Sequence, residues 1–286
     1  MIKIANDKLG VVINEKGAEL QSIFSNNIEY LWQGDARFWN KRSPVLFPVV
    51  GELKNGEFFY NSKAYKLSRH GFARDSQFNI EQTTAQSATF VLHADERSSA
   101  VYPFKFTFSV EYAINNAMLF CSYVVKNTGD DTLYFSVGGH PAFNVPLVKN
   151  LKYSNYLLKF NNDEILTRCL LHKGLISNST DQIRLNNKSL QLQHSLFYSD
   201  AIVLKHIRSN EIKLYSEMDE HGLNFKFDGF PFFGIWAAVD APFVCLEPWC
   251  GIADNIRHDQ QLIHKEGINK LAANQSWQRT WSVELF

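Results

Sequence analysis

The chain has 286 residues, of which 45% are hydrophobic and 20% are charged. These fractions are typical of a globular protein, and a chain of this length can bury a core that needs no disulfide or structural metal. Lys plus Arg and Asp plus Glu balance at 29 each. A nucleic-acid binder usually carries a basic surplus that neutralises phosphates, so we expect no nucleic-acid partner.

The sequence carries no pattern typical of export or of membrane insertion. Residues 1–8 lack the long apolar core of a signal peptide, and no apolar run approaches the roughly 20 residues needed to cross a bilayer. The cysteines stand at spacings that match no zinc or redox motif. They are Cys121, Cys169, Cys245 and Cys250. We therefore expect a cytoplasmic protein with free thiols and no membrane partner.

The dominant hydrophobic period is two, which indicates β-strands. From Phe104 to Ala113 apolar residues alternate with polar ones, and residues 118–126 follow across a short connection rich in Asn. The two segments predict an antiparallel hairpin. Further strands are expected at 89–93, 133–137, 156–160, 201–206, 211–216 and 276–285.

Helical patterns are few, and the two weak candidates are Asp35–Asn40 and Ile256–His264. Strands without alternating helices favour an all-β protein, a large antiparallel β-sandwich, over a parallel sheet flanked by helices. No linker rich in Pro, Gly or Ser and no repeat of fixed period divides the chain. We therefore predict one domain over residues 1–286.

Four segments interrupt the strand pattern and concentrate glycine, proline and ionisable side chains. They are residues 41–51, 69–74, 137–144 and 244–254. In each of them a charged or titratable side chain stands beside residues that let the backbone turn sharply. Rigid turns that carry polar groups on a β scaffold are typical of binding sites, so we expect the functional site in these segments.

His140 and Glu247 are the candidate catalytic residues. His140 follows a predicted strand in Gly-Gly-His-Pro, and Glu247 ends the apolar run that starts at Phe243. Partial burial there would raise the pKa of the carboxyl towards values that suit a general base. By residue type alone, a structural histidine bonded within a turn and a strand-end carboxylate in water explain the pattern equally well.

The remaining candidates have simple alternatives too. Arg42 and Arg74 can hold sugar hydroxyls, a phosphate or a carboxylate through bidentate hydrogen bonds, or they can simply lie solvated at the surface. Asp200 starts a predicted strand, where it can instead cap a turn. His258 and His264 are six residues apart, a spacing that fits no metal geometry, so we expect no metal site.

In order along the chain, these segments resemble the aldose 1-epimerase (galactose mutarotase) superfamily, and most closely its branch of LacX-like and glucose-6-phosphate 1-epimerase-like proteins. The resemblance covers most of the chain. It is carried by Leu46-Phe-Pro with Gly51, His70-Gly-Phe-Ala-Arg74, Gly139-His140-Pro, Asp200 and Leu246-Glu247-Pro.

The resemblance implies a galactose mutarotase-like supersandwich with an open cleft. His140 would protonate the ring oxygen O5 of a sugar, and Glu247 would take the proton from the hydroxyl at O1. The two groups would face each other across the cleft, far enough apart to hold both oxygens, with Trp236 as a stacking wall. Four further residues would bind the sugar: Arg42, His70, Arg74 and Asp200. No metal or cofactor is implied.

The predicted function is therefore a mutarotase that interconverts the α and β anomers of a hexose or hexose phosphate. Galactose itself is not indicated, because galactose mutarotases proper carry His-Gly-Gly where this chain has His70-Gly-Phe. The alternative is a non-catalytic carbohydrate-binding or sugar-sensing protein that uses the same cleft. The presence of both His140 and Glu247 favours the enzyme. An accessory domain of a polysaccharide lyase or glycosidase is disfavoured, because no export signal or attached module is recognisable.

Overall fold

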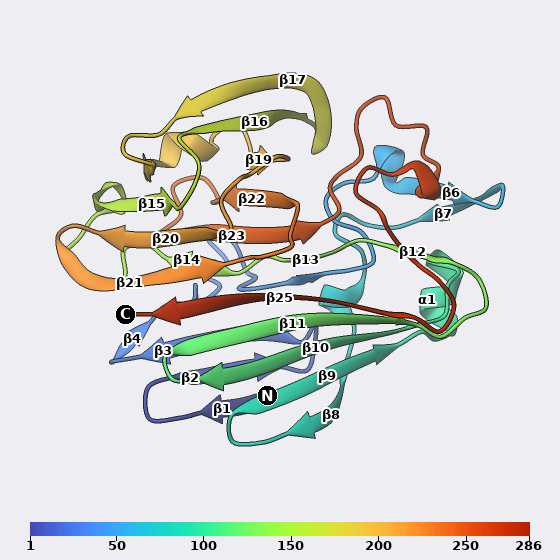
Figure 1. Cartoon of the computed structure of the whole chain (residues 1–286), viewed down its shortest axis with the longest axis horizontal. Coiled ribbons are helices and arrows are strands. Elements are labelled where there is room, and N and C mark those ends of the chain that lie inside the picture. Colours follow the sequence, from blue (N-terminus) through green and yellow to red (C-terminus); the bar gives the residue numbers. More distant parts are fainter.

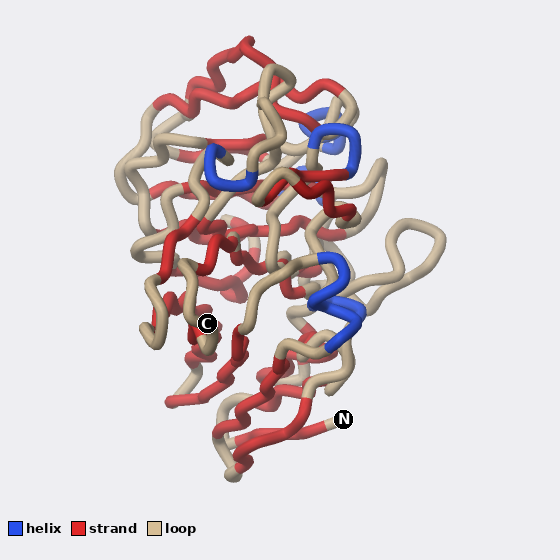
Figure 2. Tube along the Cα trace, turned by 90° about the vertical axis from the view of Figure 1, so that its right-hand side faces the viewer, coloured by secondary structure: helices blue, strands red, loops and turns tan.

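The computed structural model describes residues 1–286 and confirms the predicted all-β, antiparallel sandwich. Strands make up 51% of the residues and helices 8%. Figure 1 shows the two main layers, with β25, β11, β10 and β9 on one side and β23, β22, β16 and β17 on the other. In the view of Figure 2 the short helical turns lie in the connections between strands. None of the helices is both long and apolar enough to span a bilayer.

Two large sheets form the sandwich. The order in the nine-stranded sheet is β18 (Ser189–Gln191), β15 (Tyr156–Phe160), β20 (Glu211–Ser216), β21 (Asp219–Lys226), β25 (Ser276–Leu285), β11 (Met118–Asn127), β10 (Phe106–Asn115), β9 (Ser87–His93) and β8 (Asn79–Thr83). The order in the eight-stranded sheet is β17 (Leu175–Arg184), β16 (Ile165–His172), β19 (Ile202–Leu204), β22 (Phe232–Trp236), β23 (Phe243–Cys250), β13 (Val137–Gly139) and β5 (Val45–Leu46), with β14 (Ala142–Asn144) also paired to β23.

Smaller elements surround these sheets. The strands are β1 (Ile2–Ala5), β2 (Gly10–Asn14), β3 (Glu19–Ser25) and β4 (Ile28–Glu29) in one sheet, and the pairs β6 (Glu57–Tyr60) with β7 (Lys63–Lys66) and β12 (Leu133–Phe135) with β24 (Asn269–Leu271). The helices are α1 (Glu96–Val101) and the 3-10 turns η1 (Lys54–Gly56), η2 (Ala73–Asp75), η3 (Tyr153–Asn155), η4 (His194–Phe197) and η5 (Leu262–His264).

The hairpin predicted from alternating hydrophobicity is present as β10 and β11. Phe106, Phe108, Val110 and Tyr112 are buried, while the polar residues between them are partly exposed. The strands pair from Phe106 opposite Asn127 to Asn115 opposite Met118, so only two residues form the turn. Period-two patterning therefore predicted both the element and its buried face.

The helix predictions were wrong. Residues 256–264 contain only the single turn η5, and residues 35–40 contain no helix. The one α-helix, α1, lies where no helical pattern was recognised, and it is capped by Asp95, whose side chain accepts from the Ser98 backbone N–H. Both expected segments lack a wide apolar stripe, so polar contacts with neighbouring segments decide their conformation instead.

The two faces of the eight-stranded sheet contact different buried clusters at the ends of β22 and β23. The main core of 69 buried residues includes Phe233 and Cys250. Their strand neighbours Phe232 and Trp249 belong to a separate cluster of nine buried residues. Since successive side chains of a strand point to opposite faces, this second cluster lies on the other face of the sheet.

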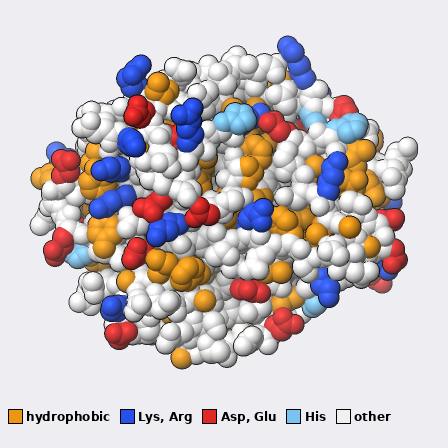
Figure 3. All heavy atoms as spheres, in the orientation of Figure 1, with side chains coloured by type: hydrophobic (Ala, Val, Ile, Leu, Met, Phe, Trp, Pro, Cys, Tyr) orange, Lys and Arg blue, Asp and Glu red, His pale blue; other side chains and the backbone are white.

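On the molecular surface seen in Figure 3, Lys and Arg are interspersed with Asp and Glu.

Candidate active site

A pocket of about 250 Å³ opens over the second cluster of the eight-stranded sheet. Five of the six residues predicted to form the site line it: His70, Arg74, His140, Asp200 and Glu247. Aromatic and apolar side chains complete the walls: Trp39, Trp236, Trp249, Ile176, Val203 and Ile252. The structure therefore brings together residues that are separated by up to 177 positions in the sequence, from 70 to 247.

The pairing of β13 with β23 places His140 opposite Glu247. Gly138 pairs with Trp249, and continuing this antiparallel register by two residues brings position 140 to position 247. A side chain at Gly138 would begin 2.6 Å from Cδ1 of Trp249, so only glycine permits this close approach. His140 Nε2 lies 3.3 Å from Glu247 Oε1, and their side chains are 10% and 2% exposed.

This contact corrects the expected spacing of the pair. The two groups lie side by side in direct contact rather than across the pocket from each other. A sugar's O1 and O5 are bonded to the same carbon, C1, so an acid and a base that are adjacent can reach both oxygens from one side. The expectation of a gap overlooked this shared carbon.

Burial shifts the pKa values of the pair in opposite directions. Burial lowers the pKa of His140 to about 3, and the nearby charges of Arg69 and Arg74 act in the same direction. Burial raises the pKa of Glu247 well above its ordinary value, although the charge of Arg69 opposes this shift. Burial therefore disfavours the charged form of both groups and shifts the pair towards a neutral imidazole beside a protonated carboxyl group.

His70 is buried next to this pair in a strained backbone conformation. Its φ angle is 68°, and its ring packs edge-on to His140 at a centroid distance of 5.8 Å. The Gly51 N–H donates to Nδ1 at 3.1 Å, and Arg69 Nε donates to Nε2 at 3.2 Å, so both ring nitrogens accept hydrogen bonds. Burial, followed by the charges of His140 and the arginines, holds the pKa of His70 well below its ordinary value.

Arg69 is a pocket residue that the sequence analysis did not single out. It lines the pocket, and its Nε lies 3.2 Å from Nε2 of His70. Arg74 also lines the pocket, and its one carboxylate neighbour is Asp75 at 3.6 Å. The pocket thus holds two guanidinium groups, of which only that of Arg74 forms an ion pair with a carboxylate. The signal was present, because Arg69 opens the same segment as His70 and Arg74.

Tryptophans form the aromatic wall. Trp236 was expected here, but Trp39 and Trp249 were not. Trp39 packs over the His140 ring at 4.9 Å with an interplanar angle of 30°, and against Trp236 edge-on at 5.4 Å. Trp39 was missed because residues 35–40 were interpreted as a weak helix rather than as a loop that covers the site.

Asp200 lies in the pocket and also bonds the neighbouring backbone. It lines the pocket, and its Oδ1 accepts from the Ala201 backbone N–H at 2.7 Å, as a turn-capping side chain does. Its φ angle is +141°, which is unusual for a residue with a side chain. Backbone strain of this kind clusters at functional sites.

Arg42, the sixth predicted site residue, does not line the pocket. Its Nη1 donates to the Gln21 carbonyl at 2.6 Å and to Gln33 Oε1 at 2.9 Å. Its own carbonyl accepts from the N–H of Ala142, two residues after His140. Arg42 therefore supports the site from outside, and the neighbouring proline-rich turn gave no information about the direction of the side chain.

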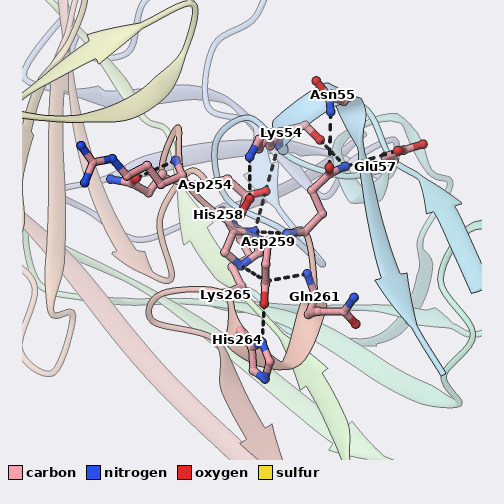
Figure 4. A network of polar contacts seen from close by, with 12 residues as sticks. Lys54, Asn55, Glu57, Asp254, His258, Asp259, Gln261, His264 and Lys265 are labelled. Atoms are coloured by element: carbon pink, nitrogen blue, oxygen red, sulfur yellow. Dashed lines mark hydrogen bonds and ion pairs between the residues drawn. The ribbon is translucent and has the colours of Figure 1, made fainter. Parts of the chain in front are cut away.

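A polar network around Asp254 adjoins the pocket residues Ile252 and Ala253 in the chain (Figure 4). Asp254 accepts from Lys265 Nζ at 2.6 Å and from the Lys54 N–H at 2.9 Å. This joins the loop after β23 to the segment that follows Gly51. A side chain at Gly51 would begin 2.5 Å from Cβ of Ala253, so the two segments pack tightly. Since Gly51 also orients His70, the network supports the site indirectly.

The polar network stabilises the ionised form of the Asp254 carboxyl group. Burial alone would raise the pKa of Asp254, but the hydrogen bond with His258 and the charge of Lys265 outweigh it and lower the pKa to about 2. Burial lowers the pKa of Lys265, and Asp254 counteracts that shift. His258 and His264 thus pair with carboxylates, the second with Asp259 at 2.7 Å.

Comparison with solved structures assigns the fold to the galactose mutarotase-like β-sandwiches. A galactose mutarotase related enzyme from Lactobacillus acidophilus superposes with a TM-score of 0.95 at 35% identity, covering 100% of this chain and 97% of that one. A galactose mutarotase-like protein from Lactobacillus casei superposes with a TM-score of 0.91 at 31% identity, covering 100% of both chains.

Sequence comparison identifies the family. A sequence model of the aldose 1-epimerase family matches residues 1–266. The plasmid-encoded protein LacX of Lactococcus lactis is 31% identical over 295 residues, covering 99% of both chains. The chain belongs to the aldose 1-epimerase family, a family of sugar isomerases, and the resemblance inferred from its motifs is confirmed.

Proposed function

We propose that this protein is an aldose 1-epimerase that interconverts the α and β anomers of a hexose or hexose phosphate by acid–base catalysis. The observation that carries the proposal is the 3.3 Å contact between His140 Nε2 and Glu247 Oε1 on the wall of a pocket lined by arginines and tryptophans. Aromatic faces suit the apolar faces of a sugar ring, and guanidinium groups suit its hydroxyl or phosphate oxygens.

The reaction needs two proton transfers. Glu247 removes the proton from the hydroxyl at O1, the bond between C1 and O5 breaks, and His140 delivers a proton to O5. The open-chain aldehyde then rotates about C1–C2. Attack of the O5 hydroxyl on the other face of C1, with the proton transfers reversed, closes the ring as the other anomer. Each general acid or base contributes about 10²–10⁴ to the rate.

The proton needed at the start is already held by the pair. A protonated carboxyl beside a neutral imidazole contains as many protons as a carboxylate beside an imidazolium, so moving one proton across the 3.3 Å contact interconverts them. The charge of Arg69 lowers the pKa of Glu247 and therefore favours the carboxylate form that acts as the base.

Activity is expected to follow a bell-shaped pH profile with a basic limb far above 4.5, the ordinary pKa of a glutamic acid. Raising the pH through the elevated pKa of Glu247 removes the single proton of the pair and leaves no acid. Lowering the pH towards about 3, the pKa of His140, protonates both groups and leaves no base. The measurement is kcat/KM against pH, and a basic limb near 4.5 would contradict the assignment.

Arg69 and Arg74 favour an anionic sugar as substrate. Arg74→Ala is expected to weaken binding of a hexose 6-phosphate more than binding of the neutral hexose, because a hydrogen bond to a charged group contributes about 1.5–3 kcal/mol. Titration calorimetry with both sugars measures the difference. Arg279→Ala, at a partly exposed position on β25 outside the pocket, is the matched control and should change neither affinity. Equal losses for both sugars in Arg74→Ala would exclude a phosphate subsite at this arginine.

Polarimetry tests the proposed activity itself. A freshly dissolved pure anomer is mixed with the protein, and the decay of optical rotation is compared with the spontaneous decay in buffer. A faster decay for at least one hexose or hexose phosphate supports the enzyme. Binding of sugars with no acceleration for any of them would favour the sugar-sensing alternative.

A further inference from the structure

A third side chain with metal-binding chemistry lies beside the catalytic pair and has no part in the proposed reaction. The ligand atoms of His140, Cys245 and Glu247 all lie within 4.8 Å of one another, and all three residues are buried. Cys245 precedes Glu247 by two residues on β23, so both side chains point to the same face. Cys245 also pairs with Ala142, two residues after His140.

We propose that His140, Cys245 and Glu247 form an inhibitory binding site for a zinc-type transition-metal ion. Imidazole nitrogen, thiolate sulfur and carboxylate oxygen together are the donor types that zinc prefers in proteins. Zinc–nitrogen and zinc–oxygen bonds of about 2.0–2.2 Å at a tetrahedral angle separate the two ligand atoms by about 3.3–3.5 Å. The observed separation between His140 Nε2 and Glu247 Oε1 is 3.3 Å.

The sulfur completes the site with a small adjustment. The Cys245 sulfur lies within 4.8 Å of both other ligand atoms. A shift of about 1 Å brings it to the sulfur–nitrogen and sulfur–oxygen separations of a tetrahedral zinc site. The fourth position then faces the pocket, where water or a sugar hydroxyl can occupy it. The neutral imidazole favoured by burial is already in the form that binds a metal.

Charge influences the strength of the site. A divalent ion with one thiolate and one carboxylate is neutral overall, which suits a buried position, while Arg69 and Arg74 oppose a cation.

Metal binding would block the reaction, because it uses the two atoms that transfer protons. This consequence rests on the proposed function, whereas the binding itself does not. Zinc should therefore inhibit anomer exchange, and EDTA should restore the full rate. A protein that binds the metal but never accelerates anomer exchange would refute the proposed function and leave the metal site intact.

Cobalt(II) is the direct probe of the site, since a thiolate ligand gives it a sulfur-to-metal charge-transfer band in the near ultraviolet. The wild type should develop this band on titration, and Cys245→Ser should not. Calorimetry should show that Cys245→Ser binds zinc at least tenfold more weakly than the wild type. Even residues that only orient a metal ligand typically contribute about 10–100-fold to metal affinity. Cys121→Ser, at another buried free thiol, is the matched control and should keep both signals.

Two results would overturn this site. One is a wild-type protein that shows no charge-transfer band at saturating cobalt. The other is a Cys245→Ser variant that binds zinc as tightly as the wild type, which would show that the sulfur is no ligand. Circular dichroism of both variants checks that each is folded. The conservative Cys245→Ala variant repeats the test if serine disturbs the core.

Discussion

His140→Asn and Glu247→Gln are each expected to slow anomer exchange by about two orders of magnitude or more, with little change in sugar affinity. Both substitutions preserve approximate shape and hydrogen bonding but abolish proton transfer at neutral pH. Since the two side chains are in direct contact, their effects should not add: the double variant should be about as slow as either single one. Rates from polarimetry and affinities from calorimetry separate the two effects.

The same chemical changes elsewhere in the chain are the control. His194→Asn alters a histidine that stacks on Tyr153 outside the pocket, and Glu266→Gln alters a carboxylate paired with Lys205. Both variants should retain the wild-type rate. A His140→Asn protein that keeps more than about a tenth of the wild-type rate would exclude His140 as the main general acid.

Asp254→Asn is expected to lower the free energy of unfolding by about 3–5 kcal/mol, the loss usual when one partner of a buried ion pair is removed. Asp254 and Lys265 are both 1% exposed and are 2.6 Å apart, so the substitution leaves a buried ammonium group without its counter-charge. Glu266→Gln is the matched control, because the Lys205–Glu266 pair has the same 2.6 Å separation but is 19% and 44% exposed. That variant should lose only about 0–1 kcal/mol.

The pH dependence of unfolding gives an independent check on Asp254. Its pKa in the folded protein, about 2, lies below the ordinary value of 3.8. A group with a lowered pKa stabilises the fold above its ordinary pKa and loses this contribution as the pH falls towards its folded value. The wild type should therefore lose the Asp254 contribution between about pH 4 and pH 2, and Asp254→Asn should not. Equal stability of Asp254→Asn and Glu266→Gln in urea would disprove the importance of the pair.

The strands were predictable because their buried apolar residues recur at every second position of the sequence. Phe106, Phe108, Val110 and Tyr112 alternate with polar residues, and all four are buried. The segments predicted at 156–160, 211–216 and 276–285 coincide with β15, β20 and β25. The short α1 was not predictable from periodicity, because none of its residues is buried.

The segments that form the site were predictable, because each combines glycine or proline with ionisable residues. The direction in which a single side chain points was not predictable. The segments around His70, His140 and Glu247 converge on the pocket as expected. Arg42 belongs to a similar segment, yet the Gln21 carbonyl and the Gln33 side chain hold its guanidinium elsewhere. Only the folded chain reveals which polar groups compete for an arginine.

Contacts between residues that are distant in the sequence could not be predicted from residue spacing either. Cys245 matched no metal motif, because its partner His140 is 105 residues away in the sequence and joins it only through the pairing of β14 with β23. The pKa shifts of His140 and Glu247 could not be derived from sequence spacing either. They follow from the burial of both groups, which depends on the complete sandwich around them.

The most direct test of the proposed function is NMR exchange spectroscopy of α and β anomers at equilibrium. Glucose, galactose and their 6-phosphates are each measured with wild-type protein, with the His140→Asn and Glu247→Gln double variant, and in buffer alone. We predict exchange well above the buffer rate for at least one sugar with the wild type, and the buffer rate with the double variant. Exchange at the buffer rate for every sugar, with binding intact, would contradict catalysis by this pair.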